Sequence, residues 1–96
     1  MFEVMQTDKF EEWLDGLRDR KGQEVVAKRI IRMQSGLLGD VKAVGNGVSE
    51  ARIKFGPGYR LYFVKRHQVI IILLCGGDKG SQSRDIARAK EMAKEV

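Results

Sequence analysis

The feature that most constrains this chain is a run of three strand-like segments within residues 48–79. Between Glu50 and Phe55 charged and apolar side chains alternate, which is the pattern of a strand with one solvent-facing side and one buried side. Residues 69–75 are apolar throughout, so we expect them to form the strand that the rest of the fold covers most fully. Segments this close in the chain pair as antiparallel hairpins. The sequence therefore predicts a mostly antiparallel sheet.

Two short turns connect these segments. The Gly-Pro-Gly sequence at residues 56–58 suits a tight turn, because proline pre-sets one φ angle and glycine accepts positive φ. The polar residues 65–68 suit the second turn. Gly76 and Gly77 then end the last strand and carry Lys79 to the rim of the predicted sheet.

Helices and one further strand are expected before this sheet. Residues 2–5 resemble a short opening strand, and Thr7 or Asp8 is expected to cap the helix that follows. That helix has an apolar stripe made of Phe10, Trp13, Leu14 and Leu17. A bend at Lys21 and Gly22 leads into a second helix. Its apolar stripe is made of Val26, Ile30, Met33 and Leu37.

A glycine-rich loop is expected over residues 35–47, and a last helix with a thin apolar side over residues 84–95. The predicted order is β-α-α-β-β-β-α, a single small α+β domain over residues 1–96 with the two N-terminal helices on one face of the sheet. No apolar run approaches the ~20 residues of a membrane span, and no signal-peptide pattern opens the chain. Since one cysteine forms no internal disulfide, we expect a cytoplasmic protein without membrane association.

Positive charge is concentrated on the predicted hairpin. The net charge of the chain is +5, and most of it lies in residues 47–66, where Glu50 is the only acidic residue. Such a patch favours a polyanion or an acidic protein as partner. A solvated basic face without a ligand is the alternative interpretation.

No motif for a metal, a nucleotide or another cofactor occurs in the chain, so we expect neither a metal nor a cofactor. The single histidine, His67, falls in a predicted turn and is expected to be exposed to solvent rather than catalytic. Cys75 falls in the predicted buried strand and is expected to pack in the core.

One cluster of polar side chains is expected to carry chemistry. Arg52 and Lys54, two residues apart, project to the same side of their strand. Arg60 and Tyr62 do so on the next strand. Antiparallel pairing brings all four together, and Lys79 joins them from the adjacent strand. Several cations in one place suit a phosphodiester substrate, and they favour the neutral amine that a lysine such as Lys54 needs to act as a base.

Two long motifs give the chain a resemblance to a known family. Residues 45–63 read GxGVSExRIxxGPGYRxYF, and residues 73–90 read LLCGGDKxxQxxDIxxAK. Both resemble the "addiction module killer" (HigB-like) branch of the RelE/ParE toxin superfamily, and the likeness extends to residues 13–15 and 39–41. The resemblance covers nearly the whole chain. It implies a compact RelE-like α+β fold and a bacterial type II toxin, neutralised by a cognate antitoxin with a helix-turn-helix domain.

The resemblance implies two alternative activities. RelE-like members cleave mRNA in the ribosomal A site without metal, through attack by the ribose 2′-hydroxyl, and so act as ribosome-dependent endoribonucleases (mRNA interferases) that inhibit translation. ParE-like members instead poison DNA gyrase and have no nuclease activity. A degenerate toxin that serves only as the partner of its antitoxin is a third interpretation.

The resemblance also implies roles for individual residues in the RelE-like case. Arg52 and Lys54 match a pair of lysines in the family, of which the second is a suggested base. Arg60 matches an arginine that stabilises the transition state, and Lys79 lies at or near the position of a second arginine. The C-terminal tyrosine that stacks on the substrate base has no counterpart, and Tyr62 is the expected substitute.

Further basic residues are candidates for contacts to RNA or to the ribosome. Three of them are expected on the outward side of the second helix, and two lie in the turn of the last hairpin. They are Lys28, Arg29, Arg32, Lys65 and Arg66. A solvated helix face is the alternative for the first three. Phosphate contacts by these residues would depend on salt concentration.

Overall fold

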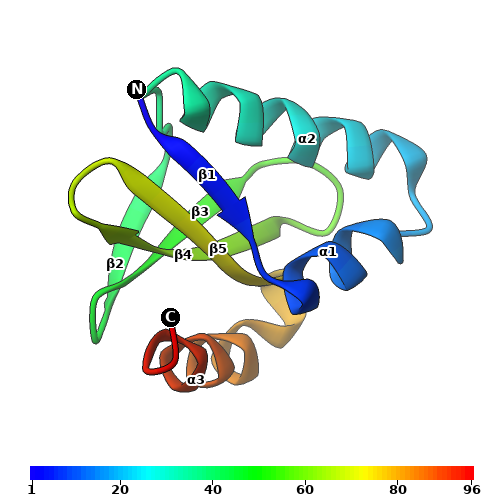
Figure 1. Ribbon diagram of the computed structural model, residues 1–96. Coiled ribbons are helices and arrows are strands. Elements are labelled where there is room, and N and C mark those ends of the chain that lie inside the picture. The colour runs from blue at the N-terminus through cyan, green and yellow to red at the C-terminus, as the bar shows by residue number, and fades with distance from the viewer.

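Five strands and three α-helices follow one another in the computed structural model, which describes residues 1–96 (Figure 1). The elements are β1 (Glu3–Gln6), α1 (Asp8–Asp15), α2 (Arg20–Gln34), β2 (Val41–Gly45), β3 (Val48–Ile53), β4 (Tyr59–Arg66), β5 (Ile70–Gly77), the 3-10 turn η1 (Lys79–Ser81) and α3 (Gln82–Ala93). The α+β class is as predicted, but the order contains one strand more than the sequence suggests. None of the helices has the length and apolar character that crossing a membrane requires.

The five strands form one mixed sheet in the order β1-β5-β4-β3-β2. β3, β4 and β5 pair antiparallel as two consecutive hairpins, which confirms the central prediction. The opening strand β1 lies parallel to β5 at one edge of the sheet. The first strand of the chain, β1, therefore lies next to the last strand, β5, in the same sheet.

The sequence predicts a loop where β2 lies, and this prediction is wrong. Residues Val41–Gly45 pair antiparallel with β3 and form the other edge of the sheet. The surrounding glycines do make bends, since Gly39, Gly45 and Gly47 have positive φ, but these bends lie at the ends of a strand. Five residues with weak alternation carry little local signal, and pairing with β3 makes the segment a strand.

Helices cover both faces of the sheet (Figure 1). Helices α1 and α2 pack on one face, as predicted, and α3 packs on the other. The core on the first face consists of Phe10, Val26, Ile30, Met33, Ala51, Ile53, Tyr59, Leu61, Phe63, Ile71 and Leu73. The smaller core under α3 consists of Val48, Tyr62, Val64, Leu74, Cys75 and Ala89. The face that the sequence marks as solvent-exposed is thus partly covered by α3.

The two N-terminal helices form as predicted, but the bend between them lies elsewhere. Thr7 caps α1, because its hydroxyl accepts a hydrogen bond from the backbone N–H of Phe10 (3.1 Å). The bend falls within residues 16–19, before α2 begins, so Leu17 of the predicted stripe lies beyond α1, which ends at Asp15. Gly22, predicted to mark the bend, is buried inside α2, where the ring of Tyr59 leaves no room for a Cβ atom.

Two other helix boundaries differ from the predicted ones. Because α2 ends at Gln34, Leu37 lies beyond the helix and is 64% exposed instead of completing the apolar stripe. Helix α3 starts at Gln82, two residues earlier than predicted. Its thin apolar side is enough to bury Ala89 against the sheet, with Ile86 partly buried beside it.

Candidate functional site

Four of the predicted site residues line one pocket at an end of the sheet. This pocket, called the basic pocket here, has a volume of about 400 Å³. Its walls are Asp40, Arg52, Ile53, Lys54, Gly58, Arg60 and Lys79. Arg52 is near the end of β3 and pairs across the ladder with Arg60 at the start of β4. The predicted gathering of cations on this hairpin is therefore present in the fold.

Lys79 reaches the basic pocket because η1 packs against the turn between β3 and β4. The backbone N–H of Lys79 donates a hydrogen bond to the carbonyl oxygen of Pro57 (3.4 Å). Asp78 accepts a hydrogen bond from the backbone N–H of Gly80 (2.8 Å) and caps η1. Gly56 and Gly58 have positive φ, which gives the turn the shape that this contact needs. The Gly-Pro-Gly motif thus positions a lysine that follows it by more than 20 residues in the chain.

Asp40 is the one acidic side chain in the wall of the basic pocket. Its carboxylate pairs with the guanidinium of Arg52 at 3.0 Å, and both side chains are partly exposed. This hydrogen bond, together with the positive charges of Arg52, Lys54 and Arg29, lowers the pKa of Asp40 below its ordinary value. In the free protein Asp40 therefore occupies part of the hydrogen-bonding capacity that Arg52 offers to an anion.

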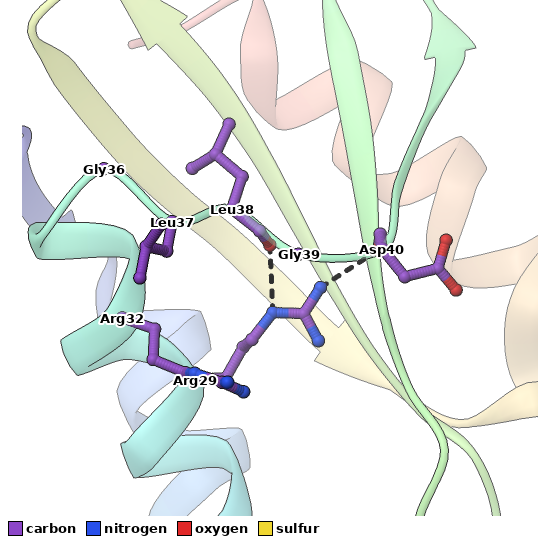
Figure 2. A pocket seen from close by; sticks show the side chains of 7 residues that line it. All are labelled: Arg29, Arg32, Gly36, Leu37, Leu38, Gly39 and Asp40. Atoms are coloured by element: carbon purple, nitrogen blue, oxygen red, sulfur yellow. Dashed lines mark hydrogen bonds between the residues drawn. The ribbon is translucent and has the colours of Figure 1, made fainter.

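Arg29 was a candidate for RNA contacts on sequence grounds, but its guanidinium has a structural role. It donates hydrogen bonds to the carbonyl oxygens of Leu38 (3.0 Å), Asp40 (3.0 Å) and Arg52 (2.8 Å). Figure 2 shows this side chain reaching from α2 to the segment before β2, with the carboxylate of Asp40 pointing away from it. Burial lowers the pKa of Arg29. Arg29 thus ties α2 to β2 and β3, which rules out the predicted outward orientation.

The other two basic residues of α2, Lys28 and Arg32, are exposed as predicted. They line a hollow of about 270 Å³ that also includes Lys54, so it adjoins the basic pocket. Arg32 further lines the hollow of about 460 Å³ beneath Leu37 and Gly39 that Figure 2 shows. Cations of α2 and of the sheet therefore follow one another along a continuous surface.

Lys65 and Arg66 lie apart from this surface, at the β4–β5 hairpin. The guanidinium of Arg66 donates hydrogen bonds to the carbonyl oxygens of Ala93 (3.1 Å) and Val96 (3.3 Å), so it holds the end of the chain after α3. The ammonium group of Lys65 lies 5.6 Å from the centre of the Phe2 ring. The structure does not bring these two residues together with the basic pocket.

Tyr62 does not line the basic pocket, which contradicts its predicted place there. Its side chain is fully buried under α3, and its hydroxyl donates a hydrogen bond to Oε2 of Glu50 (3.0 Å). Burial, followed by the hydrogen bond to Glu50, raises the pKa of Tyr62. A ring in this position cannot stack on a substrate base. Helix α3 packs over the part of the sheet where Tyr62 lies. The period-2 pattern of β4 predicts which side of the sheet Tyr62 faces, but not whether a helix covers that side.

Glu50 lies behind the basic pocket, and the sequence analysis predicted its side of the strand but not its burial. Alternation puts it on the same side of β3 as Arg52, and this is correct, but its side chain is buried instead of solvated. Oε2 of Glu50 also accepts a hydrogen bond from the amide of Gln82 (2.8 Å) and lies 3.9 Å from Nε of Arg60. A lone acid within a basic stretch was the available signal for a buried ion pair.

The predicted exposure of His67 and the predicted burial of Cys75 are confirmed. His67 is exposed in the β4–β5 turn, where it has positive φ, and it lines none of the surface around the basic pocket. Cys75 is buried under α3, and burial raises the pKa of its thiol to about 11. The fold brings no three His, Cys, Asp or Glu side chains into a group that could hold a metal ion.

Comparison with known proteins finds a relative that matches nearly the whole sequence. No protein-family model matches the sequence. An uncharacterized protein of Haemophilus influenzae (strain ATCC 51907 / DSM 11121 / KW20 / Rd) is 42% identical over 94 residues, which cover 98% of this chain and 95% of that protein. Such identity over nearly the full length of both chains implies the same fold. The chain therefore belongs to the same protein family as this Haemophilus influenzae protein.

Proposed function

We propose that this protein is the toxin of a bacterial type II toxin–antitoxin module of the RelE/ParE kind, and that it cleaves mRNA on the ribosome. The observation that carries the proposal is the basic pocket, where cations from β3, β4 and η1 surround one space of about 400 Å³. A phosphodiester matches this pocket in charge, and guanidinium groups bind phosphate oxygens in pairs. A helix-turn-helix antitoxin is the proposed protein partner, and the motifs of residues 45–63 and 73–90 support it.

The proposed reaction transfers the phosphorus from the 5′-oxygen to the 2′-oxygen of the preceding ribose. Lys54 is the proposed general base, which takes the proton of the attacking 2′-hydroxyl. Arg52 and Arg60 hold the non-bridging oxygens and stabilise the charge that develops on them. As the bond from phosphorus to the 5′-oxygen breaks, the ammonium group of Lys79 gives that oxygen a proton. One proton leaves and one proton enters, so the step is balanced.

Neighbouring phosphates of the RNA would lie along α2. Lys28 and Arg32 are the proposed contacts, because the hollow that they line shares Lys54 with the basic pocket. Arg29 and Arg66 are not part of this proposal, since carbonyl oxygens of the protein already accept their hydrogen bonds.

A second candidate function is gyrase inhibition by binding alone. The observation that favours it is the absence of an aromatic or histidine side chain from the wall of the basic pocket, together with the burial of Tyr62. A nuclease that positions a base by stacking needs such a group near the phosphate. On this alternative the cations of the basic pocket serve an acidic surface of the target protein, and mRNA stays intact.

Primer extension on an mRNA translated in a cell-free system tests the proposal. We expect wild-type protein to produce discrete cuts at translated codons, and none when ribosomes are absent. Replacing Arg60 with alanine should reduce cleavage by about 10²–10³-fold, the usual loss when one donor to a developing oxyanion is removed. Arg88→Ala is the matched control, because Arg88 is exposed on α3 and lines none of the pockets.

Arg60→Ala also leaves the buried Glu50 without its cation, so thermal unfolding is measured beside cleavage. Arg60→Lys keeps the positive charge and separates the two effects: we expect it to remain folded and still to cleave poorly, because an ammonium group lacks the planar fork of a guanidinium. Intact mRNA with folded wild-type protein would contradict the nuclease proposal. A supercoiling assay with gyrase would then test the second candidate.

A further inference from the structure

We infer that Glu50 is a positioning residue for Arg60. Glu50 belongs to β3, and residues of β4 and α3 hold its carboxylate in the orientation that positions Arg60. The inference rests on the proposed function, in which Arg60 contacts the scissile phosphate. Glu50 itself does not line the basic pocket. It acts from behind the pocket wall, on the side of the sheet that α3 covers.

The burial of this ion pair is the first argument. The side chain of Glu50 is 1% exposed and that of Arg60 is 12% exposed, and their charged groups approach to 3.9 Å. A buried charge without a partner is strongly destabilising, so each of these groups depends on the other. Arg60 is also the less exposed of the two arginines in the pocket wall, since the side chain of Arg52 is 36% exposed. Contacts with the protein interior, and not with solvent, therefore set the orientation of the Arg60 side chain.

The hydrogen bonds around Glu50 are the second argument. Oε2 accepts from the hydroxyl of Tyr62 on β4 and from the amide of Gln82, the first residue of α3. These two neutral donors hold the carboxylate in place without neutralising it. The negative charge stays available to Arg60, which is what a positioning carboxylate requires.

The atoms without partners are the third argument. Oε1 of Glu50 and Nε of Arg60 are both buried, and neither has a hydrogen-bond partner within the protein. Nη1 of Arg60 donates to the carbonyl oxygen of Gly58 (3.2 Å). Buried polar atoms without a partner are rare in folded proteins, so each of them requires an explanation. Because Nε of Arg60 lies 3.9 Å from Oε2 of Glu50, a small movement of the guanidinium would let Nε donate to this carboxylate, and its other nitrogens would stay available to an anion in the basic pocket.

Glu50→Gln separates positioning from a merely structural role. It retains the shape of the side chain and removes the charge. We expect kcat for mRNA cleavage to fall at least tenfold. Affinity for a short single-stranded RNA should stay equal or rise, because one negative charge near the basic pocket disappears. General loss of structure would lower affinity and kcat together, so this split is specific.

Two further variants complete the series. Tyr62→Phe keeps the ring and the charge of Glu50 but removes one hydrogen bond, and we expect a smaller loss of kcat with unchanged affinity. Glu91→Gln makes the same chemical change as Glu50→Gln at an exposed site on α3, where Glu91 pairs only with Lys94, and should alter neither quantity. Equal cleavage rates for Glu50→Gln and wild type would overturn the inference.

A measurement that does not need cleavage tells failure of this inference from failure of the proposed function. In NMR spectra we expect the Nε–H signal of Arg60 to exchange slowly with water in the wild type and at least tenfold faster in Glu50→Gln. Titration with inorganic phosphate should shift this signal in the wild type. If wild-type protein does not cleave mRNA but the exchange rates differ, the nuclease proposal fails and the positioning of Arg60 by Glu50 stands. Equal exchange rates in both proteins overturn the inference itself.

Discussion

At the scale of single residues, the arginines of this protein differ in what accepts their hydrogen bonds. Arg29 and Arg66 donate to backbone carbonyl oxygens, and both connect separate segments of the chain. Arg52 pairs with a partly exposed carboxylate, and Arg60 lies beside a buried one. Hydrogen bonds to backbone carbonyl oxygens hold a guanidinium in the folded structure, so its donors are not available to a ligand. A guanidinium paired with an exposed carboxylate can exchange that carboxylate for a phosphate. The acceptors thus decide which arginines are free to bind an anion.

Asp40→Asn is predicted to strengthen anion binding, because it releases Arg52 from its ion pair. Affinity for a labelled single-stranded RNA, measured by fluorescence anisotropy, should rise about two- to fivefold, the usual range for an exposed pair. Asp15→Asn on α1 is the matched control, since it makes the same charge change at an exposed site outside the pockets. Weaker binding by Asp40→Asn would show that its carboxylate assists the anion instead of competing with it.

The same pair predicts a pH dependence of stability. The pKa of Asp40 is lowered in the folded protein, so its contribution to the free energy of unfolding is present above about pH 4 and is lost as the pH falls through the lower folded-state pKa. Asp40→Asn lacks this contribution at every pH. Urea unfolding from pH 7 to pH 2 should therefore show the stabilities of wild type and variant converging below pH 4. A constant difference over this range would contradict the prediction.

At the scale of elements, the end of β5 lies between two helices that approach its backbone closely. The sequence marks Gly76 and Gly77 as the end of a strand, and in the fold they are its last paired residues. The ring of Trp13 lies against Gly76 on one face, and the carboxylate of Asp85 lies against Gly77 on the other. Neither glycine has positive φ, so close packing and not backbone conformation requires them. This contact places η1, and with it Lys79, beside the β3–β4 turn.

Gly76→Ala is predicted to destabilise the protein by about 1–3 kcal/mol, because the added Cβ atom would overlap the ring of Trp13 in a packed core. Urea unfolding monitored by the fluorescence of Trp13, the single tryptophan, measures this change. Gly80→Ala is a suitable control: the nearest atom to its added Cβ, at 3.2 Å, is the end of the Asp78 side chain, which can move. Equal losses for both variants would contradict this account.

At the scale of the whole molecule, the sheet separates two cores of unequal size. The core under α1 and α2 has eleven buried residues and the core under α3 has six. The basic pocket lies where the cover by α3 begins. Glu50 is therefore buried, while Arg52, further along β3, is partly accessible and Lys54, directly after β3, is exposed. Opening of α3 would expose Cys75 and the carboxylate behind Arg60 together.

Cys75 therefore reports on the integrity of the core under α3. Burial raises the pKa of its thiol to about 11, which lowers the thiolate fraction at pH 8 roughly 100-fold relative to an ordinary thiol. We expect its reaction with a thiol reagent to be slower by at least this factor than in urea-unfolded protein, and to accelerate along the global unfolding transition. Fast reaction in native buffer would show that α3 detaches on its own.

The sequence by itself determined the three central strands, the apolar stripes of the two N-terminal helices except at Leu17 and Leu37, the Gly-Pro-Gly turn and the burial of Cys75, because each is encoded by local periodicity or turn chemistry. It also determined that Arg52, Lys54, Arg60 and Lys79 come together, because strand pairing across two short turns leaves few alternatives. Only the tertiary structure decided what covers each side chain. Residues of β2, Tyr62, Glu50 and Arg29 have patterns compatible with solvent, and each differs from its prediction because an element distant in the sequence packs against it. Local patterns specify the side of a strand or helix, whereas burial depends on contacts between segments that the chain brings together only on folding.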